Sequence, residues 1–269
     1  SYSSLPLSKG EAGWGSSHAP SKWQYPSNLS TTSPLPSFIM INMKVSVIIP
    51  VYNEQTSLLF TYHKVKETNL VDEILFVDDG SRDMSPSILA SIQDPLVKVY
   101  THESNRGKGA AIRTGLQHAH GDILLIQDAD LEYDPRDYPV LFEPFHSQQA
   151  QVVYGSRFSE GAPEGILFWN YLANRFLTFT TNLLFGVHLS DMETGYKAFQ
   201  RDVIPQLDLQ ADGFEIEPEI TARLLKMKIP IVEVPIRFHP RRYRQGKKIR
   251  PRDAFIALWT LLKFRFTRS

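Results

Sequence analysis

The chain has 269 residues, of which 42% are hydrophobic, and its 29 basic and 29 acidic residues give a formal net charge of zero. A chain of this length can bury a full core in one large or two small domains. The balanced charge predicts no nucleic-acid partner, and the absence of cysteine excludes disulfides, thiolate metal sites and cysteine nucleophiles.

No window of about 18 residues is both strongly apolar and free of charge, so we expect no membrane-spanning helix. Residues 1–42 are rich in Ser, Pro, Gly and Thr and lack periodicity, which predicts a disordered upstream extension without chemistry, although part of it could pack as an arm. The N-terminus shows no basic segment leading into an apolar core, so we expect no signal peptide and a cytoplasmic protein.

From Met43 onward, short apolar strands alternate with helical patterns. The expected strands cover residues 45–49, 73–77, 97–100, 123–126 and 152–154, and the expected helices cover residues 54–66, 86–92, 108–118 and 137–145. This alternation predicts an α/β fold with a mostly parallel sheet that is covered by helices on both faces.

Polar side chains follow four of these strands, at the point where each strand ends. They are Asn53 and Glu54, Asp78 and Asp79, Asp128 and Asp130, and the Gly-Ser-Arg sequence at 155–157. Because the carboxyl ends of parallel strands meet at one edge, where ligands bind, these clusters predict a nucleotide-type site. No GxGxxG follows the first strand, which argues against a dinucleotide-binding fold.

Two motifs could bind ions. The sequence GDILLIQDADLE at residues 121–132 places Asp128, Asp130 and Glu132 after a buried strand. If the stretch stays extended, these carboxylates point the same way and favour Mg²⁺ or Mn²⁺ between them, whereas an ordinary acidic turn is the alternative. The sequence NRGKG at residues 105–109, at a helix start, could cradle an anion through backbone N–H groups or form a flexible loop.

The second half of the chain is more aromatic and more basic. A helix expected over residues 165–187 has an aromatic face that suits a core, an acceptor groove or a membrane-facing surface. A polar turn at 191–197, a helix over 214–228 and a strand over 231–238 follow. Residues 237–252 contain eight Lys or Arg and no acidic residue, which suits a solvated loop, phosphates or an anionic lipid surface. The helix expected over 253–266 is amphipathic.

Together, and in this order, the motifs resemble the family 2 inverting glycosyltransferases with a GT-A fold, and most closely the dolichyl- or polyprenyl-phosphate mannose or glucose synthases. The resemblance covers about residues 44–265 and rests on VSVIIPVYNE, VDDGS, NRGKGAAIRTG, DADLE, GSRF, DMETGYKAF, FEIEPEI and VPIRFHPRRYRQGKKI. It implies a Rossmann-like, mostly parallel sheet flanked by helices, with a C-terminal acceptor-side extension.

The implied domain spans residues 43–252, with a nucleotide-sugar half over about 43–157 and an acceptor half over about 158–252. An amphipathic helix over 253–269 follows. The protein would act on a nucleotide-sugar and a polyprenyl or dolichyl phosphate, as a peripheral protein at the cytoplasmic face of a membrane.

The resemblance also implies roles for single residues. Those that would bind the nucleotide-sugar are Pro50, Tyr52, Glu54, Asp79, Lys108 and Asp128. Those that would hold Mg²⁺ or Mn²⁺ on its diphosphate are Asp128, Asp130 and Glu132, although relatives often have Gln at the third place, so metal preference or donor could differ. Those that would grip diphosphate and lipid phosphate are Arg175, Arg241, Lys247 and Lys248. The candidate catalytic residues are Asp130, Asp191 and Arg157, of which Arg157 would contact a phosphate.

The acceptor decides the role of Asp191. A lipid phosphate with a second pKa near ~6 is largely ionised at pH 7 and needs no general base. A hydroxyl acceptor needs one, for which Asp191 is the candidate. The open alternatives are therefore a family 2 enzyme acting on a glycan hydroxyl, with Asp191 essential and Arg241 dispensable, and a non-catalytic nucleotide-sugar binder. The donor, the polyprenol length and the oligomeric state stay open.

Overall fold

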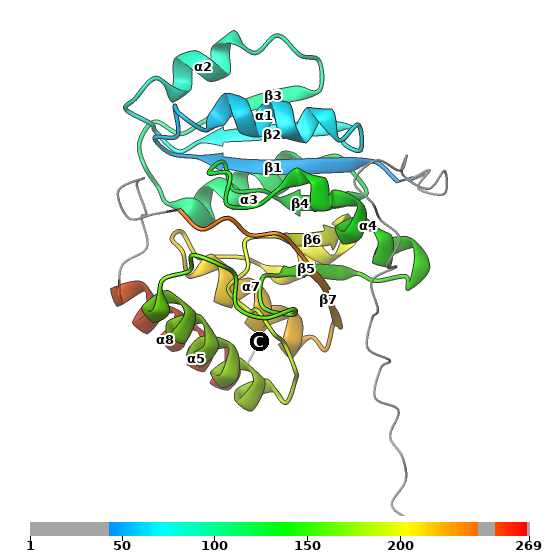
Figure 1. The fold of residues 1–269 in the computed structure, drawn as a ribbon, viewed down its shortest axis with the longest axis vertical. Helices are drawn as coiled ribbons and strands as arrows, with labels where there is room; N and C mark the ends of the chain where they lie inside the picture. The colour runs from blue at the N-terminus through cyan, green and yellow to red at the C-terminus, as the bar shows by residue number, and fades with distance from the viewer. Residues whose placement is uncertain (1–42, 242–250, 268–269) are drawn as a thin grey trace, which may run out of the picture. The chain divides into compact units, whose positions relative to one another are not determined.

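The computed structural model describes residues 43–241 and 251–267, which belong to one compact unit. The expected N-terminal extension, together with Lys247 and Lys248, lies outside the described residues. Within the described part of the chain, the backbone forms one seven-stranded sheet with helices on both faces (Figure 1). The α/β prediction is confirmed.

The strand order in this sheet is β3-β2-β1-β4-β6-β5-β7. The strands are β1 (Val45–Val51), β2 (Glu73–Asp78), β3 (Val97–Thr101), β4 (Ile123–Ile126), β5 (Val152–Ser156), β6 (Lys197–Gln200) and β7 (Ile231–Pro235). Neighbouring strands run parallel except where β6 pairs with β4 and with β5. Because β6 is reversed, the turn that precedes it lies at the edge where β4 ends.

The helices cover both faces of the sheet (Figure 1). They are α1 (Leu58–Glu67), α2 (Ser85–Ser91), α3 (Lys108–His118), α4 (Tyr138–Ser147), α5 (Phe168–Phe185), α6 (Ile204–Leu207), α7 (Ile216–Lys226) and α8 (Pro251–Phe266), with 3₁₀ turns at Pro135–Asp137 and Arg201–Val203. Alternate residues of β1 serve the two faces: Val47 and Ile49 pack with α1, α2 and α4, whereas Ile48 packs with α3 and α7. Successive side chains of a strand point to opposite faces, which is why its apolar run is continuous.

The sequence did not predict β6. The sequence KAFQ has a single alternation of apolar residues, and its strand conformation comes from pairing with β4 and β5 on either side. The strand expected over 231–238 is also shorter, because β7 ends at Pro235. The sequence of a segment alone does not predict such pairings, because whether it forms a strand depends on the neighbouring strands with which it pairs.

Helices α5 and α8 lie side by side (Figure 1) and pack with α7 around a small separate core that includes Leu177, Met192 and Leu261. Large apolar side chains nevertheless remain exposed on α5 and α8. These are Phe168, Trp169, Leu172, Phe176, Phe179 and Leu183 on α5, and Phe255, Ile256, Trp259 and Phe266 on α8. Trp169 is 75% exposed and Phe255 is 75% exposed. We call this set the α5–α8 aromatic face.

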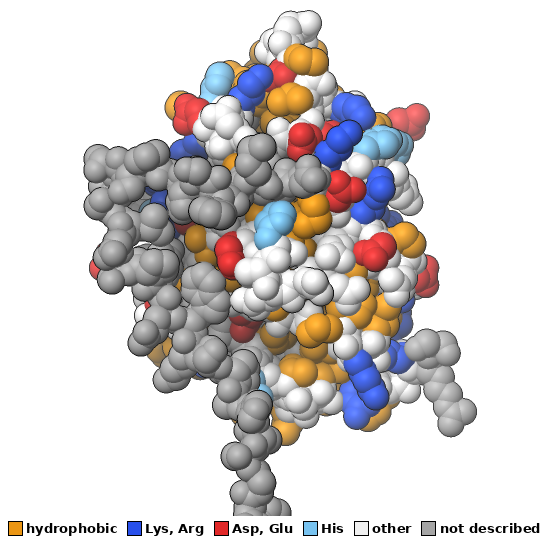
Figure 2. Space-filling view, turned by 90° about the vertical axis from the view of Figure 1, so that its right-hand side faces the viewer, with side chains coloured by type: hydrophobic (Ala, Val, Ile, Leu, Met, Phe, Trp, Pro, Cys, Tyr) orange, Lys and Arg blue, Asp and Glu red, His pale blue; other side chains and the backbone are white. Residues whose placement is uncertain are grey.

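Charge is mixed on the side of the molecule shown in Figure 2. Lys and Arg side chains there are interspersed with Asp and Glu, as the zero net charge leads one to expect. Among the described helices, none combines the length and the apolar character that crossing a bilayer requires.

Candidate active site

One buried amide holds the turn after β4. The side-chain oxygen of Gln127 accepts hydrogen bonds from the hydroxyls of Tyr138 at 2.9 Å and Tyr196 at 2.6 Å. The Gln127 side-chain nitrogen donates to the carbonyl oxygen of Asp128 at 2.9 Å. Leu131 has a φ of 62°, so the chain folds back here instead of continuing as an extended strand.

This fold-back changes how the three expected metal ligands lie, and their role as ligands stays a prediction. No group of three or more His, Asp or Glu side chains in the described part of the chain is arranged to hold a metal ion. The expectation assumed an extended stretch, whereas the chain turns at Leu131, and Glu132 Oε1 accepts from the backbone nitrogen of Arg241 at 2.8 Å. Asp128 and Asp130 remain as a candidate pair without Glu132.

The two aspartates have different surroundings. Lys108 Nζ lies 2.8 Å from Asp128 Oδ1 and 3.1 Å from Oδ2, so Asp128 has its own cation. Asp130 Oδ1 accepts from the backbone nitrogen of Glu132 at 3.1 Å. Asp130 Oδ2 lies 3.9 Å from Arg241 Nε. Burial, followed by the charges of Asp128 and Glu132, raises the pKa of Asp130 to about 7.

The Asp128–Asp130 pair fits a hard divalent cation. The pKa of Asp130 is raised because the group is buried and because nearby positive charge does not fully balance the negative charges around it. Mg²⁺ in nucleotide-dependent enzymes is usually held by one or two carboxylates, with the remaining ligands supplied by phosphates and water. Two aspartates therefore suffice, provided that a diphosphate brings further oxygens.

Arg241 connects the ends of β1 and β4. Its Nη2 lies 2.9 Å from Glu54 Oε2, and its Nε donates to the carbonyl oxygen of Asp130 at 2.6 Å. Glu54 and Arg241, predicted for nucleotide and phosphate respectively, are therefore partners of each other. The segment after β7, orange in Figure 1, thus lies against the turn that carries Asp130.

Asp79 organises the Gly-rich loop. Its Oδ1 lies 2.7 Å from His102 Nδ1 and accepts from the backbone nitrogen of Arg106 at 2.9 Å, and its Oδ2 accepts from that of Gly107 at 2.7 Å. These two backbone N–H groups therefore hold the Asp79 carboxylate within the protein, and anion binding by the loop stays a prediction. Gly107 has a φ of 105°, and a Cβ there would lie 2.2 Å from the Asp212 carbonyl oxygen, so only glycine fits.

Pro50 and Tyr52 lie at the end of β1, and both are half-buried. Pro50 pairs in register with Val77 of β2. The residues predicted to line the base and ribose are therefore spread along the ends of β1 and β2, with the carboxylates of Glu54 and Asp79 engaged by other groups of the protein.

A buried ion pair dominates the turn before β6. Arg157 donates to Asp191 from Nε at 2.6 Å and from Nη2 at 2.8 Å, and Asn174 donates to Asp191 at 3.2 Å. Burial alone would raise the pKa of Asp191, but the charge and hydrogen bonds of Arg157 outweigh it and hold that pKa below its ordinary value. Arg175 donates to the carbonyl oxygen of Ser190 at 3.3 Å, beside this pair.

The inner face of α5 holds the same turn. Thr178 Oγ1 accepts from the backbone nitrogen of Met192 at 3.2 Å. Asn182 donates to the Leu189 carbonyl oxygen and accepts from the Leu189 nitrogen, each at 2.8 Å. The helix that carries exposed aromatic residues outside therefore positions Asp191 and its neighbours inside.

The turns after β4 and before β6 meet at one glycine. The Gly195 nitrogen donates to the Tyr133 hydroxyl at 2.8 Å. A Cβ at Gly195 would lie 2.6 Å from Asp128 Oδ2. Asp128, Asp130, Lys108 and the Arg157–Asp191 pair therefore border a single site at the carboxyl edge of β4.

Comparison with known proteins shows the family of this chain. The model of glycosyl transferase family 2 matches residues 46–207, which is more than half of the chain. This protein belongs to that family. The undecaprenyl-phosphate mannosyltransferase of Micrococcus luteus is 30% identical to this glycosyltransferase over 218 residues, which are 76% of this chain and 87% of that protein.

Other relatives are similarly close. The UDP-N-acetylglucosamine–dolichyl-phosphate N-acetylglucosaminyltransferase of Methanococcus voltae is 29% identical over 218 residues, 74% of this chain and 86% of that protein. Glucosyl-3-phosphoglycerate synthase from Mycobacterium tuberculosis, solved with Mn²⁺, UDP and phosphoglyceric acid, superposes with a TM-score of 0.65 at 20% identity over 85% of this chain and 80% of that one. The expected family, enzyme class and GT-A fold are confirmed.

Sequence reasoning missed three charged residues of this glycosyltransferase site. Lys197 is fully buried and lies 2.5 Å from Glu217 Oε2, and Lys108 Nζ lies 3.1 Å from Glu217 Oε1. Glu193 has one buried oxygen without a hydrogen-bond partner, and burial raises its pKa to about 7 against the opposing charges of Lys197 and Arg157. The motifs FEIEPEI and DMETGYKAF contained these residues, but nothing in their spacing indicated that they are buried.

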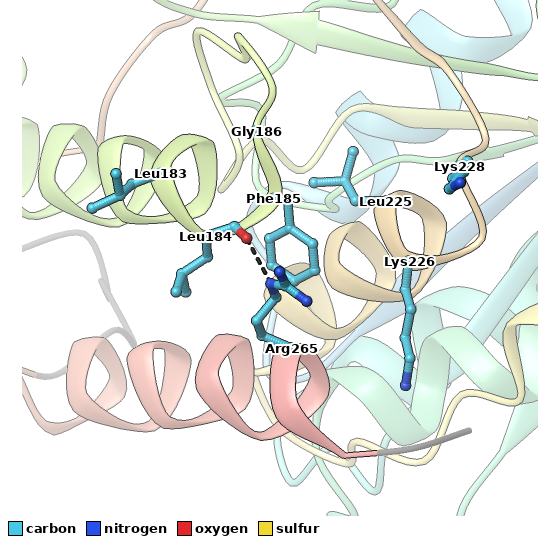
Figure 3. A pocket seen from close by; sticks show the side chains of 8 residues that line it. All are labelled: Leu183, Leu184, Phe185, Gly186, Leu225, Lys226, Lys228 and Arg265. Atoms are coloured by element: carbon cyan, nitrogen blue, oxygen red, sulfur yellow. Dashed lines mark hydrogen bonds between the residues drawn. The ribbon is translucent and has the colours of Figure 1, made fainter.

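A separate hollow of the glycosyltransferase lies away from these residues. It has a volume of about 510 Å³ and lies at the C-terminal ends of α5, α7 and α8 (Figure 3). It is lined by Leu183, Leu184, Phe185, Gly186, Leu225, Lys226, Lys228 and Arg265. Cations at helix C-termini balance the partial negative charge of the last carbonyls, which accounts for Lys226 and Arg265 without a ligand.

Proposed function

We propose that this enzyme transfers a hexose, with inversion, from a nucleoside diphosphate sugar to the phosphate of a polyprenyl or dolichyl phosphate, assisted by Mg²⁺ or Mn²⁺. The acceptors named for the two close relatives, undecaprenyl phosphate and dolichyl phosphate, support this acceptor class. The observation that carries it is the Arg157–Asp191 pair. Arg157 binds both oxygens of Asp191, and the pKa of Asp191 is lowered, so Asp191 is a poor general base. Transfer to a phosphate needs no general base, because the phosphate is already ionised.

The donor diphosphate is held at the turn after β4. Asp128 and Asp130 would hold the divalent cation, which would supply positive charge to stabilise the leaving diphosphate. Lys108 adds a positive charge at Asp128, and Arg241 keeps the ends of β1 and β4 together. The bond between the sugar C1 and the diphosphate oxygen breaks, and the pair of electrons leaves with the nucleoside diphosphate.

The acceptor phosphate approaches C1 from the opposite face. Its second pKa near ~6 leaves it largely ionised at pH 7, so an oxygen attacks without loss of a proton. Arg175, which lies beside the Arg157–Asp191 pair, is the candidate for contact with this phosphate. Attack opposite to the leaving group inverts the configuration at C1.

The lipid tail of the acceptor places the enzyme at a membrane surface, where the α5–α8 aromatic face contacts the bilayer. Trp and Phe are enriched in segments that lie in the membrane interface. Binding to vesicles of anionic phospholipid, followed by sedimentation, tests this surface. The variant Trp169→Ser with Trp259→Ser removes two exposed rings, at 75% and 68% exposure, and should weaken vesicle binding without lowering stability.

The test of the reaction is transfer of labelled sugar from GDP-mannose, UDP-glucose and UDP-N-acetylglucosamine to a short polyprenyl phosphate, with Mn²⁺ or Mg²⁺ and with EDTA. Metal-dependent label in the organic phase is the expected result and identifies the donor. Metal-dependent hydrolysis of a donor without lipid product would replace the phosphate acceptor by a hydroxyl acceptor. Donor binding without either signal would indicate a non-catalytic binder.

One observation favours the hydroxyl-acceptor alternative. The Glu193 carboxyl group, with its raised pKa and an unpartnered buried oxygen, has the properties of a general base that works near neutral pH. Transfer to polyprenyl phosphate should therefore survive the Glu193→Gln substitution, whereas transfer to a hydroxyl acceptor should not.

A further inference from the structure

Lys108 lies between two carboxylates that belong to different parts of the site. Its Nζ is 2.8 Å from Asp128 Oδ1 and 3.1 Å from Asp128 Oδ2, so it is bonded to both oxygens of one candidate metal ligand. The same Nζ is 3.1 Å from Glu217 Oε1 in the first turn of α7. The side chain is 15% exposed, so water screens these contacts only in part.

The backbone of Lys108 is fixed, which leaves movement to its side chain. Asp79 binds the two residues before it, and the glycines at 107 and 109 lie directly against the backbone of residues 211 and 212. A lysine has a flexible four-carbon stem and a compact charge. Its ammonium group can therefore exchange one carboxylate for another anion without any movement of α3.

Glu217 is suited to retain the ammonium group when it leaves Asp128. Its Oε2 is occupied by Lys197 at 2.5 Å, whereas its buried Oε1 has no hydrogen-bond partner and has Lys108 as its ion-pair partner at 3.1 Å. Lys108 thus has a second carboxylate in reach that takes no part in the Asp128–Asp130 pair.

We propose that Lys108 is an internal counter-ion of Asp128 which a divalent cation must displace, and that the donor diphosphate then takes over the displaced ammonium group. A cation arriving alone meets a carboxylate that is already neutralised and a positive charge a few ångströms away. A cation arriving with a diphosphate gives both positive charges an anion to share. Metal and donor therefore bind cooperatively. This inference rests on the proposed nucleoside diphosphate donor.

The test measures binding of Mn²⁺ alone, of GDP or UDP with Mn²⁺, and of both by the variant Lys108→Met, using calorimetry and the electron paramagnetic resonance of free Mn²⁺. The variant should bind Mn²⁺ alone at least about tenfold more tightly than the wild type, because the competing charge is gone. It should bind the nucleotide with Mn²⁺ at least about tenfold more weakly, because the diphosphate loses a cation.

The matched control is Lys98→Met, which removes a lysine from the Lys98–Glu73 ion pair of 2.7 Å and should change neither affinity. If Lys108→Met does not fold, the variant Lys108→Gln, which keeps an N–H donor beside both carboxylates, replaces it. It should likewise bind Mn²⁺ alone more tightly and the nucleotide with Mn²⁺ more weakly. Unchanged or weaker binding of Mn²⁺ alone by a folded Lys108 variant would overturn the inference. A wild type that binds Mn²⁺ neither alone nor with nucleotide would instead contradict the proposed function.

Discussion

Two aspartates of the site, Asp130 in the turn after β4 and Asp191 in the turn before β6, are in opposite electrostatic states. After β4, Asp130 is crowded by Asp128 and Glu132, and its pKa is raised to about 7. Before β6, Asp191 has a guanidinium group bonded to both oxygens, and its pKa is lowered. Asp130, whose negative charge is incompletely balanced, therefore favours a cation from outside, whereas Asp191 is part of the scaffold.

The largest effect that would test this contrast is loss of transfer in Asp130→Asn. The amide cannot supply the negative charge that holds the metal, so kcat/KM should fall about 10²–10³-fold, and the remaining activity should be insensitive to EDTA. The unfolding free energy at pH 7.5 should not fall, because a crowded carboxylate is removed. The control is Asp202→Asn at an exposed position. Full metal-dependent turnover by the Asp130→Asn variant would show that Asp130 is not a metal ligand.

The Asp191→Asn substitution should act on stability instead. Arg157 would be left in the interior without a counter-charge, which costs about 3–5 kcal/mol when a buried pair loses one partner. Because the pKa of Asp191 is lowered, its contribution is present above its unfolded pKa and is lost as the pH falls through the folded pKa. Denaturant unfolding between pH 3 and 7 measures it. If the pH profile of transfer by the Asp191→Asn variant lacks the acid limb of the wild-type profile, Asp191 acts as a general base.

A smaller effect is expected at Glu193, two residues further along. Its pKa is raised from 4.5 to about 7, so its stabilising contribution is complete below about pH 4.5 and is lost as the pH rises through 7. The Glu193→Gln variant should gain about 1–3 kcal/mol on the wild type between pH 5 and 8. Unfolding at several pH values checks this, with the exposed Glu67→Gln as control. A difference that does not change with pH would contradict the raised pKa.

The sequence predicted the fold well where strands are buried on both faces. The apolar runs of β1, β2 and β4 have few alternatives to a central parallel strand, and the helices between them followed from periodicity. It missed β6, whose pairing depends on strands that are distant in the chain. The N-terminal extension stays a prediction.

For the site, the sequence predicted which edge of the sheet carries it but not which charges are paired. Asp128, Asp130, Arg157 and Asp191 were named, and the structure brings them to one edge. That Arg241 is bonded to Glu54 could not be read from the sequence, because nearly two hundred residues separate them. The expectation for Glu132 assumed an extended backbone, whereas the left-handed residue Leu131 turns the chain there, and its role as a metal ligand stays a prediction.

Helix α5 lies between an exposed surface of the protein and the candidate active site. Its outer side carries exposed aromatic rings, and its inner side is bonded through Asn174, Thr178 and Asn182 to residues 189–192. The same helix therefore connects an exposed apolar surface with the residues that hold Asp191. If the outer side of α5 meets a membrane, as proposed, the depth at which α5 inserts would alter the position of Asp191 and with it the rate of turnover.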